Sequence, residues 1–352
     1  MQKAISVASR GMYTTKPNPR VGCLLVKNNV IISYGFHERK GHLHAEKMAL
    51  INASETKDTT MYCTLEPCNH YGLTPPCTKE ILNSNISRLV IGSIDPTSHI
   101  NGKGIREIQQ GGVEVLVGVE QEACNEINRG FIKRISSNLP WVMAKIAISQ
   151  DNCYSFINSS RKWISSQPSR KHAHLLRARS CAVVTGYKTF LGDLPKLNAR
   201  INAPTIQPLI IILDPKKIIS ESHNYFSTNR AYRIFCGSSQ VSERKSNTVT
   251  SLPINAKGRF NLREVLQELA KLECNEVLFE CGPSLISQLI QENLLDQLFV
   301  YRSNESICSY NGVRCDELMQ VMRSSQFKLK YYETKNYIGP SDTLSVYRVN
   351  NT

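Results

Sequence analysis

The sequence contains little that would place the protein in a membrane or outside the cell. Its 352 residues include no run of about 18 apolar residues, the length that a transmembrane helix needs. The opening segment, MQKAISVASRGMY, lacks the uninterrupted apolar stretch of a secretory signal peptide. We therefore expect no membrane partner and a cytoplasmic location.

Basic residues are abundant, but they form no dense block. Lysine and arginine number 43 against 29 acidic residues, which gives a formal net charge of +14. Aromatic residues make up only 7% and do not alternate with the basic ones, as they do on surfaces that bind single-stranded nucleic acids. A positive surface also suits phosphorylated small substrates. We expect a phosphorylated small molecule, and no nucleic acid, as the partner.

The twelve cysteines are scattered along the chain and lack the dense spacing of a small disulfide-rich secreted domain. We interpret most of them as small buried apolar residues. Two of them, Cys68 and Cys77, lie in a motif that suggests a different role.

The order of the predicted elements indicates two α/β domains, as the length also suggests. In the first part, strand-like and helix-like segments alternate: 21–36 (two strands around a turn at Asn28-Asn29), 44–54, 59–68, 77–86, 88–96, 104–112, 113–119 and the helix-like 122–135. After a predicted linker, Ser136–Pro140, the alternation resumes: 141–151, 169–180, 181–186, 208–215, 260–272, 276–282, 283–295 and 296–303. We place the domains at 1–138 and 139–352.

The motif HAE, His44 to Glu46, lies one predicted strand before TLEPCNHYGLTPPC, which contains Cys68 and Cys77 with eight residues between them. A catalytic zinc site has three protein ligands and one open position, and His44, Cys68 and Cys77 supply three. Glu46 is then placed to move protons without binding the metal. His-x-Glu on one segment and Pro-Cys on another is typical of zinc deaminases, in which zinc makes water nucleophilic near neutral pH.

Each part of this motif has a simpler interpretation when it is taken alone. A single HAE is usually a solvated turn of a helix, and a cysteine pair in a cytosolic protein is usually buried and inert. His42 and His70 are alternative ligands, although we expect them to contact substrate or to lie at the surface. The eight-residue gap also departs from the usual two-residue spacing of deaminase cysteines.

The segments KPNPRVG, HAE, TLEPCNHYGLTPPC and DPTSHINGKG together resemble the deaminase half of the bifunctional riboflavin-biosynthesis deaminase/reductase family. The gap between the cysteines is characteristic of this family. The resemblance implies that His44, Cys68 and Cys77 bind one zinc ion and that Glu46 is the catalytic proton shuttle. It also implies that Asn18 contacts the pyrimidine, with a turn-capping role as the alternative.

The second half is similar to the reductase of that family, which has a dihydrofolate-reductase-like fold and uses NADPH. The resemblance implies cofactor contacts at Ala147, Trp163, Thr189, Asp193 and Gly282. It implies substrate contacts at Arg177, Leu197, Arg200 and Glu280. Arginine suits bidentate capture of a phosphate, and the turn after Gly282 leads into a helix whose N-terminus favours an anion. Alone, however, such arginines are usually solvated, such turns usually only connect elements, and a tryptophan is usually core.

Departures from the family pattern lie mostly in this second half. Gln150 and Asn152 replace an apolar residue and a turn glycine, Arg161 replaces a small hydroxyl residue, and Cys281 replaces a glycine. YRSNESICSYNG, residues 301–312, replaces a loop that usually reads APxxxG.

We therefore expect a cytidine-deaminase-like α/β/α sandwich fused to a dihydrofolate-reductase-like α/β domain, in a homo-oligomer. The first would hydrolytically deaminate 2,5-diamino-6-ribosylamino-4(3H)-pyrimidinone 5′-phosphate, and the second would reduce the ribosyl chain to ribityl with NADPH. One alternative is a deaminase fused to an inactive reductase-like domain. Two others are a nucleic-acid base deaminase and a non-enzymatic zinc protein, although structural zinc sites usually close with four ligands.

Overall fold

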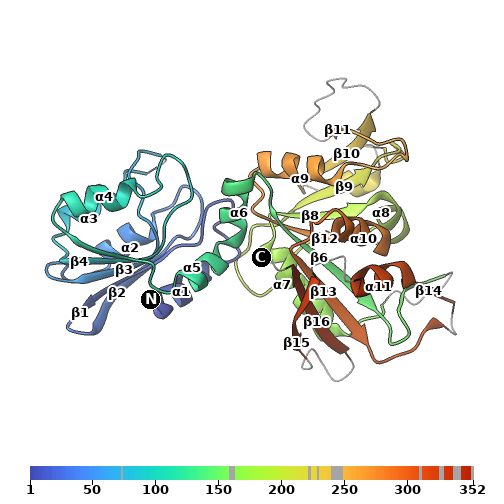
Figure 1. The fold of residues 1–352 in the computed structure, drawn as a ribbon, viewed down its shortest axis with the longest axis horizontal. Helices are drawn as coiled ribbons and strands as arrows, with labels where there is room; N and C mark the ends of the chain where they lie inside the picture. The colour runs from blue at the N-terminus through green and yellow to red at the C-terminus, as the bar shows by residue number, and fades with distance from the viewer. Residues whose placement is uncertain are drawn as a thin grey trace. The chain divides into compact units, whose positions relative to one another are not determined.

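The computed structural model divides the chain into two compact units, Met1–Asn138 and Leu139–Thr352, each with its own sheet (Figure 1). The described residues are 1–72, 74–157, 163–220, 223–227, 230–238, 249–308, 311–324, 329–335 and 342–349. The departure at Arg161 lies outside them. Within the described ranges, no helix is both long and apolar enough to cross a membrane.

The first unit is built on a five-stranded sheet with the order β2-β1-β3-β4-β5. Its strands are β1 (Gly22–Lys27), β2 (Val30–Phe36), β3 (Thr60–Leu65), β4 (Arg88–Ser93) and β5 (Glu114–Val117). β1 runs antiparallel to β2 and β3, whereas β3, β4 and β5 are parallel. The predicted turn between β1 and β2 is present, with Asn28 and Asn29 at φ values of 49° and 63°, which asparagine tolerates in tight hairpins.

Helices cover both faces of this sheet. They are α1 (Gln2–Ala8), α2 (Ala45–Ile51), α3 (Cys77–Asn83), α4 (Lys103–Gln110), α5 (Gln121–Ile127) and α6 (Arg129–Ser137), with the 3₁₀ turn η1 (Ser9–Gly11). In β1, Cys23 and Leu25 join the core under α2, α3 and α4, while Leu24 packs against α1 on the other face. A Cβ at Gly35 would lie 2.2 Å from the Ala45 carbonyl oxygen, so glycine lets α2 lie directly on β2.

The single helix predicted over 122–135 is wrong, because the chain breaks at Asn128 into α5 and α6. The Asn128 side chain bonds both to the backbone N–H of Arg20, at 2.8 Å, and to its carbonyl oxygen, at 2.9 Å. This contact with a distant segment fixes Asn128 at a φ of −111°. The predicted linker is also shorter than expected, because α6 continues through Ser137.

The second unit is built on a nine-stranded sheet with the order β11-β10-β9-β8-β12-β6-β13-β16-β15. Its strands are β6 (Trp141–Ile148), β8 (Ala182–Gly186), β9 (Leu209–Asp214), β10 (Tyr232–Ser238), β11 (Val249–Pro253), β12 (Glu276–Glu280), β13 (Gln297–Ser303), β15 (Leu329–Lys335) and β16 (Asp342–Val349). The strands from β11 to β13 in this order are parallel, and β16 and β15 add an antiparallel edge. A separate ribbon pairs β7 (Cys153–Phe156) with β14 (Gly312–Arg314).

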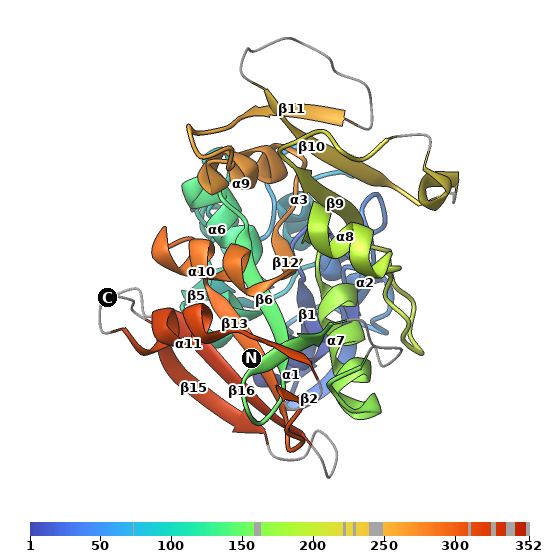
Figure 2. The same ribbon diagram turned by 90° about the vertical axis from the view of Figure 1, so that its right-hand side faces the viewer.

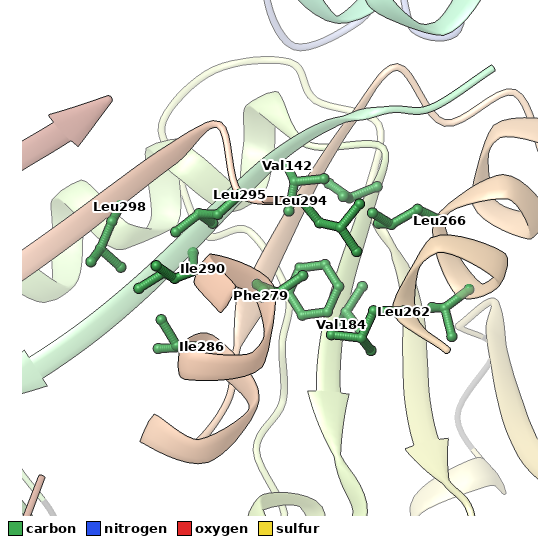
Figure 3. Packing of buried hydrophobic residues seen from close by; sticks show 14 of the residues in the cluster. Val142, Val184, Leu262, Leu266, Phe279, Ile286, Ile290, Leu294, Leu295 and Leu298 are labelled. Atoms are coloured by element: carbon green, nitrogen blue, oxygen red, sulfur yellow. The ribbon is translucent and has the colours of Figure 1, made fainter. Parts of the chain in front are cut away.

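Helices α9 (Leu262–Lys271), α10 (Pro283–Gln291) and α11 (Asp316–Arg323) lie on one face of this sheet, and α7 (Gln167–Arg179) and α8 (Tyr187–Asp193) lie on the other (Figure 2). A 3₁₀ turn, η2 (Asn224–Ser227), follows β9. In β6, Val142, Ala144 and Ile146 enter the core under α9 and α10, whereas Met143 enters the opposite core. Figure 3 shows Val142 and Phe279 packed among the leucines and isoleucines of the first of these cores.

Cys153 and Cys308 form a disulfide, and the other ten cysteines form none. The sequence interpretation of the cysteines did not anticipate this pair.

Candidate active sites

Three of the predicted functional side chains in the first unit meet at the N-terminal ends of two helices. His44 precedes α2, Cys77 begins α3, and Cys68 lies in the loop between β3 and α3. His44 Nδ1 lies 3.3 Å from Cys77 Sγ and 3.5 Å from Cys68 Sγ, and the three ligand atoms all lie within 4.8 Å of one another. Donors around tetrahedral zinc lie roughly 3.5 Å apart, so the set fits one zinc ion with an open fourth position.

The thiols of this cluster favour one thiolate even before a metal is considered. The hydrogen bond from Cys77, together with that from His44, lowers the pKa of Cys68. The thiolate is the form of cysteine that binds metals, so Cys68 is prepared for this role. The interaction with Cys68 and burial raise the pKa of Cys77.

Thr74 lies on the other side of the His44 ring, with its hydroxyl 3.2 Å from Nε2. If Nε2 carries the proton and donates it to this hydroxyl, Nδ1 is left as the acceptor that faces the two sulfurs. Such an outer contact fixes both the tautomer and the ring orientation of a metal-binding histidine. Sequence reasoning missed Thr74, although it lies within the characteristic GLTPPC segment.

Glu46 is the second residue of α2, and only 4% of its surface is exposed. Burial raises its pKa to about 7, while the nearby His44 charge acts in the opposite direction. A carboxyl group with a pKa near neutrality exchanges protons readily in both directions at the pH of a cell. Glu46 therefore has the environment that a proton shuttle needs, two residues after His44 at the start of α2.

Asn18 reaches the same cluster through His37, a residue that sequence reasoning missed. The Asn18 amide nitrogen lies 3.0 Å from His37 Nε2, and His37 Nδ1 lies 3.1 Å from the Leu43 carbonyl oxygen. Because the carbonyl can only accept, Nδ1 donates and Nε2 accepts from Asn18. The His37 ring in turn meets the His44 ring edge-on, with 5.3 Å between their centroids.

Glu66, two residues before Cys68, holds the loop between β4 and α4 in place. It is 3% exposed, and its carboxylate accepts hydrogen bonds from the backbone N–H groups of Asp95, Gly102, Gly104 and Ile105. A Cβ at Gly104 would lie 2.3 Å from the Pro67 carbonyl oxygen, so this loop packs directly on the Pro-Cys motif. The carboxylate thereby holds this loop against the segment that contains Cys68.

His42 and His70 lie outside the cluster. His42 is exposed, with its Nδ1 3.6 Å from a Glu38 carboxylate oxygen, and the His70 ring packs against His99 at 4.5 Å between centroids. Neither belongs to the group of described side chains that is close enough to share an ion with His44.

In the second unit, several predicted residues lie at one edge of the sheet. Ala147 is near the end of β6, Glu280 ends β12, Gly282 precedes α10, and Thr189 lies on α8, which directly follows β8. β8, β12 and β6 are parallel neighbours, so their carboxyl ends lie at the same edge. This edge is where open α/β sheets bind ligands.

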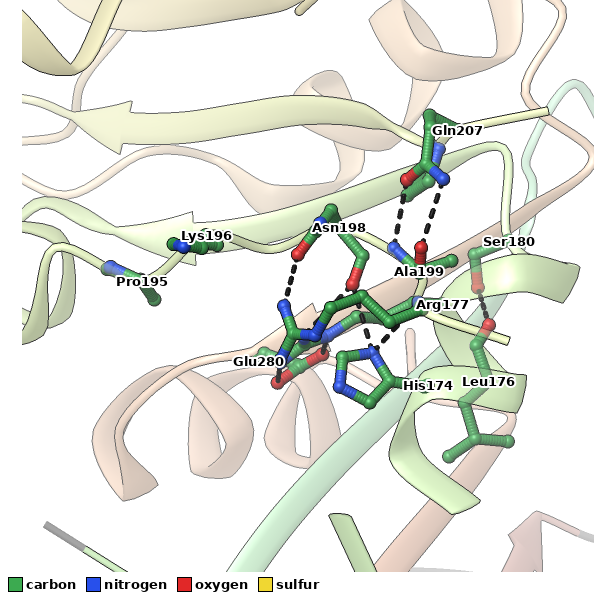
Figure 4. A network of polar contacts seen from close by, with 12 residues as sticks. His174, Leu176, Arg177, Ser180, Pro195, Lys196, Asn198, Ala199, Gln207 and Glu280 are labelled. Atoms are coloured by element: carbon green, nitrogen blue, oxygen red, sulfur yellow. Dashed lines mark hydrogen bonds and ion pairs between the residues drawn. The ribbon is translucent and has the colours of Figure 1, made fainter. Parts of the chain in front are cut away.

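Arg177 and Glu280, two predicted substrate contacts, bind each other (Figure 4). The guanidinium donates to both carboxylate oxygens, at 2.5 and 2.9 Å, and also to the Asn198 carbonyl oxygen. The two side chains are only 14% and 10% exposed. Burial alone would raise the pKa of Glu280, but the Arg177 charge outweighs it and the pKa is lowered.

The other predicted residues of this half differ in their exposure. The Leu197 side chain is 2% exposed and lies in the core on the α7 and α8 face, so only its backbone remains to meet a ligand. Arg200 is exposed and donates to the Asn198 side chain, close enough to Arg177 for the two charges to interact.

The predicted cofactor contacts Asp193 and Trp163 are both exposed. Asp193 ends α8. Trp163 is 61% exposed, with the Arg170 guanidinium 5.0 Å from its ring centre.

Two family models match the chain, one in each unit. Residues 1–93 match the cytidine and deoxycytidylate deaminase zinc-binding region, and residues 140–303 match the RibD C-terminal domain. The riboflavin biosynthesis protein RibD of Aquifex aeolicus is 36% identical over 302 residues, which cover 86% of this chain and 85% of that protein. RibD of Escherichia coli is 33% identical over 357 residues, which cover 97% and 96%. The chain belongs to the RibD family.

Solved structures of RibD family members match the whole chain. RibD of Acinetobacter baumannii has a TM-score of 0.86 at 29% identity and covers 99% of this chain and 98% of its own. A Thermotoga maritima protein described as a diaminohydroxyphosphoribosylaminopyrimidine deaminase/5-amino-6-(5-phosphoribosylamino)uracil reductase has a TM-score of 0.84 at 28% identity, with 99% and 97% covered. The expected fold, a cytidine-deaminase-like domain followed by a RibD reductase domain, is confirmed.

Membership of the RibD family makes the protein a bifunctional enzyme of riboflavin biosynthesis, with a zinc-dependent deaminase and an NADPH-dependent reductase. The expected function, enzyme class and cofactors are therefore confirmed.

One departure from the family pattern also has a physical explanation. Asn152 replaces a turn glycine at a φ of 63°, and asparagine is the side chain that tolerates this left-handed conformation best after glycine.

Proposed function

We propose that residues 1–138 hydrolytically deaminate 2,5-diamino-6-ribosylamino-4(3H)-pyrimidinone 5′-phosphate and that residues 139–352 reduce the ribosyl chain of the product to ribityl with NADPH. The description of the Thermotoga maritima relative, which matches almost the whole chain, supports these substrates. The observation that carries the first half of the proposal is the meeting of His44, Cys68 and Cys77 beside the buried Glu46 carboxyl.

His44, Cys68 and Cys77 would hold the zinc ion, because their donor set and spacing suit it. Bound zinc supplies a Lewis acid that makes water nucleophilic near neutral pH. The Glu46 carboxylate would take a proton from the attacking water and deliver it to the pyrimidine ring nitrogen. The same carboxyl would then carry a proton to the leaving amine, so that ammonia departs as the carbonyl forms.

Asn18 would orient the pyrimidine. Its amide nitrogen is already engaged by His37, which leaves the amide oxygen to accept a hydrogen bond from an amino or ring N–H group of the substrate. Burial lowers the pKa of His37, which keeps its ring neutral and so preserves this arrangement.

The carboxyl edge of the second sheet would hold NADPH against the sugar. Gly186 and Gly282 precede α8 and α10 there, and a Cβ at either position would meet no other described heavy atom within 4 Å. This open space in front of two helix N-termini suits an anionic dinucleotide. Hydride transfer then depends on the alignment of the nicotinamide with the sugar carbon more than on an acid or base.

For NADPH we assign contacts to five residues at or near this edge: Ala147, Trp163, Thr189, Asp193 and Gly282. For the phosphorylated sugar we assign Arg177, Leu197, Arg200 and Glu280. Partial burial and the neighbouring Arg177 charge lower the pKa of Arg200, so an anion at this place would relieve the repulsion between the two guanidinium groups. The substrate phosphate is such an anion.

We also propose a cytoplasmic homo-oligomer that does not bind nucleic acid. The scattered basic residues support the last point. β2 is an edge strand of the first sheet and exposes Val30, Ile31 and Tyr34, which suits pairing with a second copy.

Zinc analysis combined with separate assays of the two half-reactions tests this proposal. We expect about one zinc ion per chain, ammonia release from the diaminopyrimidinone, and NADPH oxidation only when the deaminated intermediate is supplied. Deamination without any NADPH oxidation would instead indicate an inactive reductase domain. Salt-sensitive binding to single-stranded RNA or DNA, with deaminated bases in it, would contradict the choice of substrate.

A further inference from the structure

The disulfide between Cys153 and Cys308 joins two segments that lie 155 residues apart in the chain. Cys153 begins β7 and is fully buried, whereas Cys308 follows β13 and is half-buried. Cys153 directly follows SQDN at 149–152 and Cys308 lies in YRSNESICSYNG at 301–312, the two segments in which the sequence departs from the family pattern. The two departures are therefore parts of one structural feature.

Hydrogen bonds join the same two segments. The Asp151 carboxylate accepts the backbone N–H groups of Ile307, at 3.1 Å, and Cys308, at 2.9 Å. The Gln150 N–H donates to the Glu305 carbonyl oxygen at 2.9 Å, and the Arg302 guanidinium donates to the carbonyl oxygens of Ser149 and Gln150 at 3.1 Å. The disulfide thus closes two segments that are already aligned by backbone and side-chain hydrogen bonds.

This feature, which we call the crosslinked corner (residues 149–153 and 304–308), borders the carboxyl edge of the second sheet. β6 ends at Ile148 and β13 at Ser303, and the two strands are parallel neighbours. Ala147 on β6 is paired with Tyr301 on β13, directly before the corner begins. The corner therefore fixes the chain that leaves the two strands beside the assigned NADPH contact at Ala147.

We propose that Cys153 and Cys308 are a redox-reversible modification site, whose oxidised form holds this edge in the shape that binds NADPH. The proposal rests on the assignment of NADPH to this edge. Reducing compartments keep most thiols free, so a disulfide that forms there reports on the redox state of its surroundings.

Oxidation would proceed by thiol–disulfide exchange with a low-molecular-weight disulfide. Cys308 is the more accessible sulfur and therefore the one that attacks. The Arg314 guanidinium, 3.9 Å from it, favours its thiolate, whereas the Asp151 carboxylate, within 4.8 Å of both sulfurs, opposes it. Its attack releases one small thiol and leaves a mixed disulfide on Cys308. The Cys153 thiolate then attacks the Cys308 sulfur and releases the second small thiol. Two protein thiols thereby lose two electrons and two protons, and the small disulfide gains both.

The test compares the full zinc-loaded protein before and after treatment with a water-soluble phosphine. The phosphine reduces the disulfide to two thiols and becomes its oxide, with oxygen from water. Peptide masses of a non-reduced digest should show a Cys153–Cys308 crosslink before treatment, and thiol titration should gain two groups after it. After reduction the loop must be ordered again when NADPH binds, so NADPH should bind about threefold to tenfold more weakly. Deamination should not change.

Cys308→Ser supplies the matched variant and Cys181→Ser the control, since Cys181 is a half-buried free thiol away from the corner. Cys308→Ser should bind NADPH like the reduced protein and should not respond to phosphine, whereas Cys181→Ser should behave like the unaltered chain. Equal NADPH affinity in both redox states, or a second zinc ion held by the reduced pair, would overturn the proposal. Redox-dependent NADPH binding without NADPH oxidation would support the crosslink and count only against the proposed reductase activity.

Discussion

The two candidate sites of this protein are built in different ways. The proposed metal ligands and proton shuttle of the deaminase site come from two short segments, 44–46 and 68–77, at the starts of α2 and α3. The residues proposed for the reductase site, from Ala147 to Gly282, come together only because β8, β12 and β6 are neighbours in a parallel sheet. The first site depends on local geometry and the second on the topology of a whole sheet.

This difference determines whether a substitution should change activity alone or activity and stability together. A reactive side chain in the deaminase site can be replaced by an unreactive one while the fold around it remains. Helix ends and a loop held by Glu66 support the site. In the reductase site, two residues that we propose for binding, Arg177 and Glu280, also form a buried ion pair that stabilises the fold. We therefore expect clean losses of activity in the first unit and mixed effects in the second.

Glu46→Gln should give the largest effect on activity. The amide cannot shuttle protons, so the deamination rate should fall by about 10²- to 10⁴-fold. Zinc content and NADPH-dependent reduction of the deaminated intermediate should stay near those of the unaltered protein. Ammonia release, metal analysis and NADPH absorbance provide the three readouts. Glu80→Gln is the control, because Glu80 is in the same unit and pairs with Lys47 at 2.6 Å.

Loss of zinc in Glu46→Gln, with deamination falling only in proportion, would show that Glu46 is structural. Substitutions in the deaminase site would then change structure and activity together, as we expect for the reductase site.

Glu280→Gln should affect stability and reduction together. Removing one charge from a buried ion pair leaves the other uncompensated, which costs roughly 3 to 5 kcal/mol of unfolding free energy. NADPH oxidation should fall, while ammonia release at a temperature where the protein remains folded should not. Denaturant unfolding followed by the signal of each unit measures the first effect. The Glu268→Gln variant is the control, because Glu268 pairs with the exposed Lys271.

The same pair sets a dependence of stability on pH. The folded-state pKa of Glu280 lies below its ordinary value of 4.5, so its contribution is fully present above that pH. The contribution is lost as the pH falls through the lower folded-state pKa. Glu280→Gln should therefore flatten the acid side of the stability profile below pH 4.5. If the free energy of unfolding of Glu280→Gln falls below pH 4.5 as steeply as that of the unaltered protein, Arg177 does not stabilise the Glu280 carboxylate.

The sequence was sufficient to predict the elements that carry strong local patterns. The Asn28-Asn29 hairpin and the alternation of the main strands and helices follow from periodicity and turn residues. The HAE and TLEPC segments also led to the cluster of His44, Cys68 and Cys77, because the ends of regular elements place such residues with little freedom. The residues of the deaminase site are therefore easier to predict from sequence than those of the reductase site.

Contacts between distant residues were not predictable in this way. The break at Asn128 depends on a hydrogen bond to Arg20, and the pair of Arg177 and Glu280 joins residues 103 positions apart. His37 and Thr74 were missed for the same reason, since each acts through a neighbour that only the fold provides. Local periodicity carries no information about such pairings.

Thr74→Val should weaken zinc binding and little else. Removal of the hydroxyl that orients His44 Nε2 should lower zinc affinity by about 10- to 100-fold, as for other outer contacts of metal-binding histidines. Competition with a chromogenic chelator measures this directly, without an activity assay. Thr74→Ser keeps the hydroxyl and should keep the affinity. If both variants bind zinc like the unaltered protein, the orientation of His44 comes from its place at the start of α2 alone.

Arg200→Ala should give the smallest effect, and one confined to the reductase. An exposed arginine that binds a phosphate contributes roughly 1.5 kcal/mol through a charged hydrogen bond, so the KM for the deaminated intermediate should rise about tenfold. The stability of the chain should barely change, because Arg200 is exposed and its side chain only donates a surface hydrogen bond to Asn198. Arg200→Lys should recover part of the loss, since lysine keeps the charge but not the planar fork. Equal damage to deamination would mean that the two sites share this residue, and the separation of local and distributed sites would have to be abandoned.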